Sequence, residues 1–475
     1  MRRALRITGL TLLLSAPSLP LVAQSVDAAG AAAVRPLLRL GEALRRADQD
    51  AYGNRGARGI AAAQRAATLT PLRGILPSTR FEAGYMRTTD PIGAFGTLLR
   101  QRVIGQEDFD PARLNYPAVA SNYTGAVILE QPLFNADALA GRRAAHRASE
   151  ATDASTEWTA LSTRVDIVRA YYGAILAREK VATLSASVRA AREHVRRAEA
   201  MARNGLVTSS DALLAAVKAG EVEAMLVEAE GDAANATLGL ATAMGNPSDT
   251  LFTLPATLPG SDAVRALAND VLQANDAASS RADVRAARAG AEAASADALR
   301  ARSLYVPRLN AFARYDWNSA LRPFGGDNNW SAGVMASWSP FSGASEIAEA
   351  RATEGRRRAA DAMREGAVAR AQLEVQQTAR TLQVALVRLD LAERAVRQSA
   401  EAHRIVARKY EGGLAAVVEL LDASAAETQS RLALAAARHE LVVTSAERRK
   451  ALGLDPGAID VLDAAVASAE SPDRS

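Results

Sequence analysis

Two carboxylates, Glu419 and Asp422, have the types and spacing to do chemistry together. Residues three apart on a helix lie on one face, so both side chains would project to the same side. Repeated around an axis, such a pair would form an acidic ring that attracts cations. Both residues also lie close to an expected helix start, so stabilisation of a helix N-terminus by negative charge is the competing interpretation.

No other grouping indicates a reactive centre. The four histidines lie on long helical segments among Arg and Glu, without metal-ligand spacing: His146, His194, His403 and His439. We therefore expect them on solvated helix faces. The chain has no cysteine and no phosphate-binding glycine loop. The sequence predicts no enzyme activity, no cofactor and no metal site.

The N-terminus has the order of a secretory signal peptide, predicted over residues 1–23. A basic start is followed by an apolar stretch broken by Pro17 and Pro20, and then by Ala23. A cytosolic N-terminal helix is the alternative. The formal charge of +4 includes Arg2, Arg3 and Arg6, and without them 54 basic residues face 53 acidic ones. This near-neutral balance predicts no nucleic-acid partner.

The chain repeats itself once at a fixed register. The pairs Pro132 and Pro340, Gly205 and Gly413, and Gly245 and Gly453 are each 208 positions apart. Upstream, Pro77 pairs with Pro307 and Tyr85 with Tyr315 at a separation of 230. The first copy therefore holds 22 extra residues between Pro77 and Pro132, and the pattern indicates one duplicated architecture.

Each copy predicts a helix, two strands, a very long helix and a shorter return helix. The first repeat is expected over 24–246, with strands at about 79–89 and 122–131 and helices at about 136–203 and 210–244. A linker over 247–262 leads to the second repeat, 263–454, with strands at about 308–318 and 329–339 and helices at about 345–410 and 418–452. A mobile tail is expected over 455–475. Narrow seams of small apolar residues on the long helices predict coiled-coil packing, although helices alone also fit a soluble bundle.

The strands separate these interpretations. In one segment an apolar face alternates with a mainly polar one, and the other three segments repeat the pattern with aromatics near their ends. The apolar face holds Leu309, Ala311, Ala313, Tyr315 and Trp317, and the other holds Asn310, Phe312, Arg314 and Asp316. About ten alternating residues are typical of a membrane barrel strand, although any one of them also suits a soluble hairpin. The connections, about 89–122 and 321–329, are expected to be polar loops. Four strands cannot close a barrel in lipid, so copies of the chain are expected to pool their strands. Two copies would give eight strands around a filled interior, whereas three would give twelve around a lumen, so an open duct favours a trimer.

This combination resembles the TolC family of outer-membrane efflux ducts over nearly the whole mature chain. The resemblance rests on the duplication, on the Pro132 and Pro340 junctions and on two helix-turn-helix tips, 204–211 and 410–423. It implies an α+β membrane protein with a coiled-coil helical barrel and a shared 12-stranded trimeric β-barrel. It also implies a homotrimer in outer-membrane lipid, with a tunnel in the periplasm that docks to a periplasmic adaptor and an inner-membrane pump.

The resemblance assigns roles to the tips. Glu419 and Asp422 match acidic residues that ring the periplasmic entrance, and Tyr410 matches a residue that helps to close it. The basic partner expected soon after Gly413 is missing, because Ala415 stands there. Adaptor docking and gating are expected to involve the following residues: Gly205, Leu206, Asp211, Tyr410, Gly413 and Leu414. For the two leucines, local turn packing is the alternative.

Two other functions stay open on the sequence. A periplasmic adaptor would show one helical hairpin flanked by small β domains, and a structural coiled-coil protein would lack the strands. Drugs, metals and secreted proteins cannot be told apart as cargo.

Overall fold

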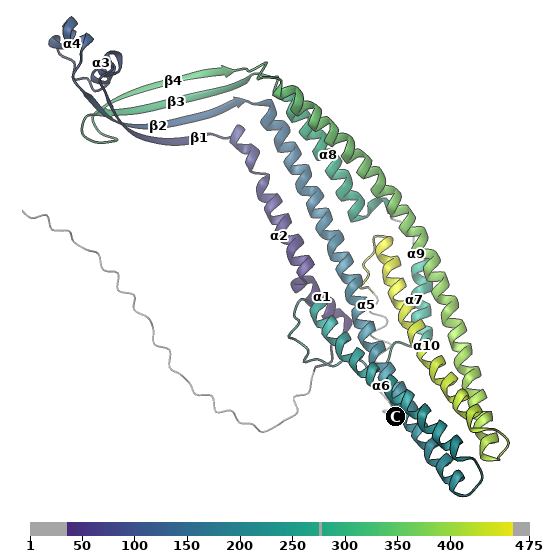
Figure 1. Ribbon diagram of the computed structural model, residues 1–475. Coiled ribbons are helices and arrows are strands. Elements are labelled where there is room, and N and C mark those ends of the chain that lie inside the picture. Colours follow the sequence, from purple (N-terminus) through teal and green to yellow (C-terminus); the bar gives the residue numbers. More distant parts are fainter. Residues whose placement is uncertain (1–35, 275–277, 459–475) are drawn as a thin grey trace, which may run out of the picture.

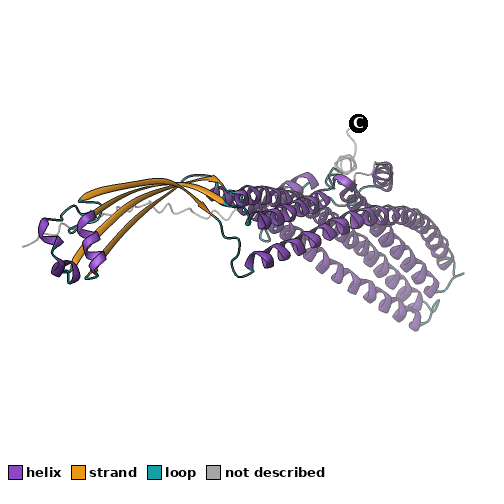
Figure 2. Ribbon diagram, turned by 90° about the horizontal axis from the view of Figure 1, so that it is seen from above, coloured by secondary structure: helices purple, strands orange, loops and turns teal. Residues whose placement is uncertain are grey.

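The computed structural model describes residues 36–274 and 278–458. A curved four-stranded sheet stands at one end of a long bundle of helices (Figure 1). Seen from above, the strands lean away from the helices as one curved ribbon (Figure 2). The predicted signal peptide and residues 459–475 of the predicted tail lie outside the described residues.

Two helical hairpins form the length of the molecule. α5 (Ala136–Arg203) and α9 (Ser345–Glu411) have 68 and 67 residues, so each extends roughly 100 Å at 1.5 Å per residue. The return helices α6 (Ser209–Ala243) and α10 (Val417–Ala451) pack along them. Both hairpin tips lie at the end opposite the sheet (Figure 1).

The duplication is visible in the register of the elements. α6 and α10 begin 208 positions apart and end 208 positions apart. The strands β1 (Ser78–Thr88) and β3 (Arg308–Ser319) begin 230 positions apart. The predicted fold class, long helices with four strands in two copies, is confirmed.

Shorter helices complete each copy and surround the core. They are α1 (Leu40–Asp50), α2 (Tyr52–Ala67), α7 (Ser261–Gln273) and α8 (Ala282–Ser303). The main core lies midway along the hairpins and buries Tyr171, Tyr172, Leu240 and Leu389. The segment that links the copies also contributes Phe252, Leu254 and Leu258 to this core. It is a packed part of the fold.

The sheet is antiparallel with the order β1-β2-β3-β4, so β1 and β4 are its edges. β2 (Ala120–Phe134) is longer than predicted, because it continues through an irregularity at Pro132–Phe134 while still pairing with β3. Proline has no N–H to donate, and a break in the register tolerates it. β4 covers Asp327–Ser337.

The connection from β1 to β2 differs from the expected polar loop. It holds α3 (Pro91–Arg100) and α4 (Pro111–Asn115) with a 3-10 turn, Gln106–Phe109, between them. The side chains of Asp90 and Asp110 accept hydrogen bonds from the backbone N–H groups of Gly93 and Ala112. Each Asp precedes a proline at the first helical position, which is a recognised helix start.

Candidate functional site: a two-faced sheet and two helix tips

One face of the sheet is apolar across all four strands. The register places Ala83 opposite Gly125, Val127 opposite Tyr315, and Tyr315 opposite Trp330. Residues directly opposite one another project to the same side. Side chains on this face are largely exposed in the single chain, including Phe81 (71%) and Trp330 (76%). Such a face requires an apolar environment, and its alternation and aromatic ends are typical of strands that face lipid.

The opposite face of the sheet carries polar groups that bond to one another. Arg314 forms ion pairs with Glu82 at 3.2 Å and with Asp316 at 2.6 Å. Asn310 donates to Glu130 at 3.0 Å. These residues lie on three neighbouring strands, so the network crosses the sheet. A polar interior beside an apolar exterior is the arrangement of a water-filled membrane barrel.

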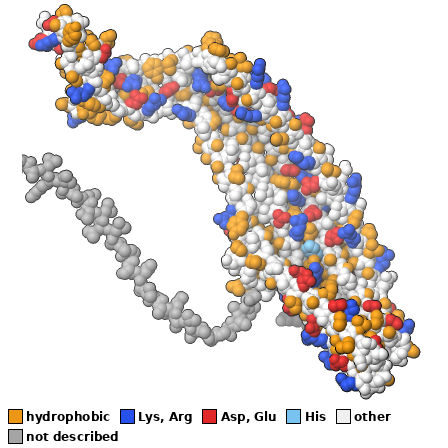
Figure 3. Space-filling view, in the orientation of Figure 1, with side chains coloured by type: hydrophobic (Ala, Val, Ile, Leu, Met, Phe, Trp, Pro, Cys, Tyr) orange, Lys and Arg blue, Asp and Glu red, His pale blue; other side chains and the backbone are white. Residues whose placement is uncertain are grey.

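The insertion between β1 and β2 is attached to the polar face. Gln101, directly after α3, donates to the Asn122 side chain at 2.8 Å, and Asn122 in turn donates to Asn318 at 2.9 Å. All three side chains are buried. The extra residues of the first copy are therefore held at the end of the sheet farthest from the helices. Hydrophobic side chains gather at this end (Figure 3).

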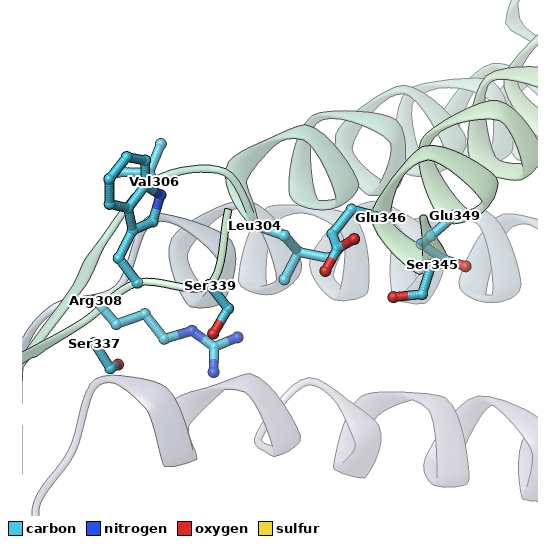
Figure 4. A pocket seen from close by; sticks show the side chains of 9 residues that line it. Leu304, Val306, Arg308, Ser337, Ser339, Ser345, Glu346 and Glu349 are labelled. Carbon is cyan, nitrogen blue, oxygen red and sulfur yellow. The ribbon is translucent and has the colours of Figure 1, made fainter. Parts of the chain in front are cut away.

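The strands meet the helices beside a cavity of about 400 Å³. Arg308, Ser337, Glu346 and Glu349 line it together with Leu304 and Val306 (Figure 4). Arg308 pairs with Asp137 of α5 at 2.6 Å, and the indole N–H of Trp338 donates to the Tyr305 carbonyl oxygen at 3.1 Å. These contacts fix the angle between sheet and helices. The role of these contacts is therefore structural.

The helix tips reverse at glycines, as the sequence predicts. Gly205 and Gly413 both have φ of +71°, a backbone conformation that residues other than glycine rarely adopt. Each is followed by an exposed apolar side chain, Leu206 at 70% and Leu414 at 82%. Local packing does not cover these leucines within the described chain.

A small hydrophobic cluster joins the two tips. It contains Ala198 of α5, Ala215 of α6, Tyr410 of α9, and Val417, Leu420 and Leu421 of α10. We call it the tip cluster. Burial raises the pKa of the Tyr410 hydroxyl, and the charge of Asp211 raises it further, while Arg197 opposes the shift. In the part of the chain that the structure describes, this hydroxyl is buried without a hydrogen-bond partner.

Asp211 begins α6. Its carboxylate accepts a hydrogen bond from the Thr208 backbone N–H at 3.0 Å, and the Thr208 hydroxyl accepts one from the Asp211 N–H at 3.2 Å. This is a reciprocal capping box. The sequence motif Thr-Ser-Ser-Asp could have indicated this role beside the proposed docking role.

Glu419 and Asp422 both lie exposed near the start of α10. The residue that precedes α10 is Ala416, and within the described chain no side-chain hydrogen bond caps the start of this helix. Asp422 lines a groove of about 710 Å³ between α6 and α10, together with Lys218 and Glu221. The pKa of Lys218 is raised by its hydrogen bond to Glu221 and also by the charge of Asp422. Within one chain, therefore, Asp422 already has a cationic neighbour.

A basic residue near Tyr410 comes from another helix. Arg197 of α5 pairs with Glu411 of α9 at 3.2 Å, so an ion pair joins the two hairpins beside the tip cluster. Sequence reasoning searched for the partner after Gly413 and found Ala415. It missed Arg197 because this residue and its partner Glu411 are 214 positions apart in the chain.

The expectation that all four histidines lie on solvated faces is wrong for three of them. His146 is exposed, but His194, His403 and His439 are partly buried. The rings of His194 and His403 contact edge to face, with their centroids 6.2 Å apart. The two positions are 209 apart in the sequence, one more than the repeat register of 208. Burial lowers the pKa of His439, which packs against α5 at Gly173.

A family model described as outer membrane efflux protein matches residues 104–246 and 274–454. The chain belongs to this family. The predicted outer-membrane location is thereby confirmed, as is the predicted family. Members of this family are channels for efflux.

Solved structures of bacterial membrane proteins share the fold of this efflux protein. VceC from Vibrio cholerae is 19% identical with a TM-score of 0.71, over 87% of this chain and 96% of that one. A membrane protein from Pseudomonas aeruginosa is 18% identical with a TM-score of 0.73, over 88% and 92%. The CmeC channel from Campylobacter jejuni is 15% identical with a TM-score of 0.72, over 92% and 90%. No curated protein matches the chain in a sequence search.

In residues 36–274 and 278–458, no helix combines the length and the apolar character that a membrane span needs. The same residues hold no group of three or more His, Cys, Asp or Glu side chains arranged to bind a metal ion.

Proposed function

We propose that this efflux protein is the exit duct of a tripartite efflux or type I secretion system. Three chains pool their sheets into one 12-stranded barrel, and their hairpins form a tunnel in the periplasm. The observation that carries this proposal is the two-faced sheet with two unpaired edges, β1 and β4. An edge strand with free N–H and C=O groups is too costly in lipid, so β4 of one chain pairs with β1 of the next.

The barrel is open because twelve strands enclose more space than side chains fill. The ion-paired face with Arg314, Glu82 and Asp316 lines this space, and the aromatic face meets lipid. Transport along it is passive, and an inner-membrane pump provides the energy.

At the periplasmic end, three copies of Glu419 and Asp422 form the acidic ring of the entrance. The tip cluster and the Arg197–Glu411 ion pair hold the hairpins together there. Both partners of this pair are more than half exposed, so it contributes about 0–1 kcal/mol. The ion pair is therefore a weak part of the closure, which a docking partner can break.

The exposed Leu206 and Leu414 are the contacts for a periplasmic adaptor. Apolar side chains at the centre of a contact contribute most of its affinity, so two charges there are expected to abolish docking. Leu206→Asp and Leu414→Asp should remove capture of the cognate adaptor, while Leu213→Asp, equally exposed on α6, serves as the control.

Conductance tests the proposal most directly. Detergent-purified full-length protein in a planar lipid bilayer should give discrete single-channel currents. Protein that stays water-soluble without detergent and gives no currents at any pH would contradict the duct.

A further inference from the structure

The contact between His194 and His403 joins the two hairpins. His194 lies on α5, one turn from Ala198 of the tip cluster, and His403 lies on α9. His403 in turn bonds to α10, where Glu427 Oε2 lies 2.6 Å from its Nδ1. The contact therefore ties three helices together immediately above the tips.

The two histidines have unequal surroundings. Glu427 gives His403 an anionic partner, and Glu427 is also bonded by Arg431 at 3.0 Å. Burial tends to raise the pKa of Glu427, but the hydrogen bonds from His403 and Arg431 outweigh it and the pKa is lowered. Among the described residues His194 has no such partner, since both of its ring nitrogens are buried there without a hydrogen bond.

The charges around His194 oppose its protonation. Burial lowers its pKa, and so do His403 and Arg197, while Glu193 on its own helix partly compensates. His194 also lines the groove between α6 and α10. The charged groups there are Lys218 and Glu221 of α6, which pair at 2.8 Å, and Asp422 of α10. The groove gives protons a route to the ring.

We propose that His194 and His403 form a proton-sensitive contact that holds the hairpin tips together at neutral pH and releases them in acid. The proposal rests on the proposed function for its consequence, opening of the entrance. A protonated His194 would be a buried cation beside a second imidazole, and this state is relieved when α5 separates from α9 and water reaches the ring.

The sign of the effect follows from linkage. The ring binds a proton more readily when the tips are apart, so acid favours the open arrangement. The effect begins as the pH falls through about 6.5, the ordinary pKa of histidine, and grows until the lowered pKa is reached. At pH 5.0 the open population can rise by at most about 30-fold per chain.

Thiol labelling measures the opening without depending on conductance. The chain has no native cysteine, so Ala198→Cys reports on a fully buried position of the tip cluster and Leu206→Cys on an exposed position. The labelling rate of Cys at 198, divided by that of Cys at 206, should rise several-fold between pH 7.5 and pH 5.0. His194→Gln, which cannot be charged, should remove this rise.

His146→Gln is the matched control, since it removes an exposed histidine from the same helix. It should leave the rise intact. Near-ultraviolet circular dichroism establishes that each variant is folded, and His194→Asn replaces His194→Gln if that variant fails. An equal rise in the labelling ratio with His194 intact and with His194→Gln, each measured in the two cysteine backgrounds, would overturn the inference.

Single-channel recording separates this inference from the proposed function. Currents whose open probability does not change between pH 7.5 and 5.0, together with a constant labelling ratio, would overturn the switch and leave the duct standing. A pH-dependent labelling ratio without currents at any pH would support the switch while contradicting the duct.

Discussion

At the scale of single residues, the most buried charge is Arg281. Its side chain is 1% exposed and bonds to Asp283 at 2.9 Å, to Glu374 at 2.6 Å and to the Ala451 carbonyl oxygen at 3.0 Å. It also lies over the ring of Trp158, 4.5 Å from the centroid. These contacts connect α5, α8, α9 and the end of α10. One guanidinium thus joins four helices of the two repeats.

Replacing Arg281 should destabilise the protein strongly. Arg281→Ala leaves two carboxylates and a helix-terminal carbonyl without their cation, which costs about 3–5 kcal/mol of unfolding free energy. Denaturant unfolding followed by circular dichroism measures the loss. Arg285→Ala is the control, because it removes an ion pair to Glu157 that is about half exposed and should cost about 0–1 kcal/mol. Equal losses in the two variants would contradict the structural role of Arg281.

A second residue-scale prediction concerns the entrance. Replacing Glu419 and Asp422 together with Ala should weaken the preference for cations and the block by divalent cations in single-channel recordings. The effect should shrink at high salt, where the charges are screened. Asp262→Ala removes a fully exposed carboxylate far from the tips and should change neither property. If the pair only stabilises the start of α10, the double variant should lose thermal stability at unchanged selectivity.

At the scale of elements, four glycines end or reverse the hairpin helices, but their surroundings differ. Gly205 and Gly413 have open space around the position of a Cβ atom. At Gly245, with φ of +90°, a Cβ would lie 2.2 Å from the Asp50 carbonyl oxygen. At its counterpart Gly453, an added Cβ would meet only Arg281, whose nearest atom would be 3.5 Å away. The end of α6 is therefore packed against the α1–α2 junction more closely than the end of α10 is packed against Arg281.

This difference predicts an order of stabilities. Gly205→Ala should cost only the backbone strain, about 1–2 kcal/mol. Gly245→Ala should cost that strain and a further 1–3 kcal/mol or so for the backbone contact. Thermal unfolding of both variants beside Gly453→Ala measures the order, with Gly245→Ala the least stable. Three equal midpoints would show that the close approach at Asp50 relaxes freely.

Sequence reasoning could predict elements better than contacts. Proline and glycine positions determine where helices end, so the repeat register predicted the long helices and the tips. The alternation of Tyr315 and Trp317 with polar neighbours predicted a sheet with two faces. The Arg197–Glu411 pair and the His194–His403 contact could not be predicted, because they depend on how far one hairpin is shifted along the other. The two Asp-Pro helix starts at 90 and 110 were readable but were missed.

At the scale of the whole molecule, the described chain is an incomplete structure by itself. Its aromatic sheet face is exposed and both sheet edges are unpaired. Native mass measurement in detergent should give a trimer. A stable monomer that keeps its β content would defeat the shared barrel, and a dimer would give eight strands whose interior is filled by side chains.

The open edges also have a genetic consequence. A chain whose β1 edge is damaged still offers an intact β4 edge to a neighbour, and so it can enter an assembly that it cannot close. If two alleles are expressed equally and mix at random, only roughly one trimer in eight contains wild-type chains alone. Damage confined to one edge should therefore be dominant over the wild type, whereas loss of the whole chain should be recessive.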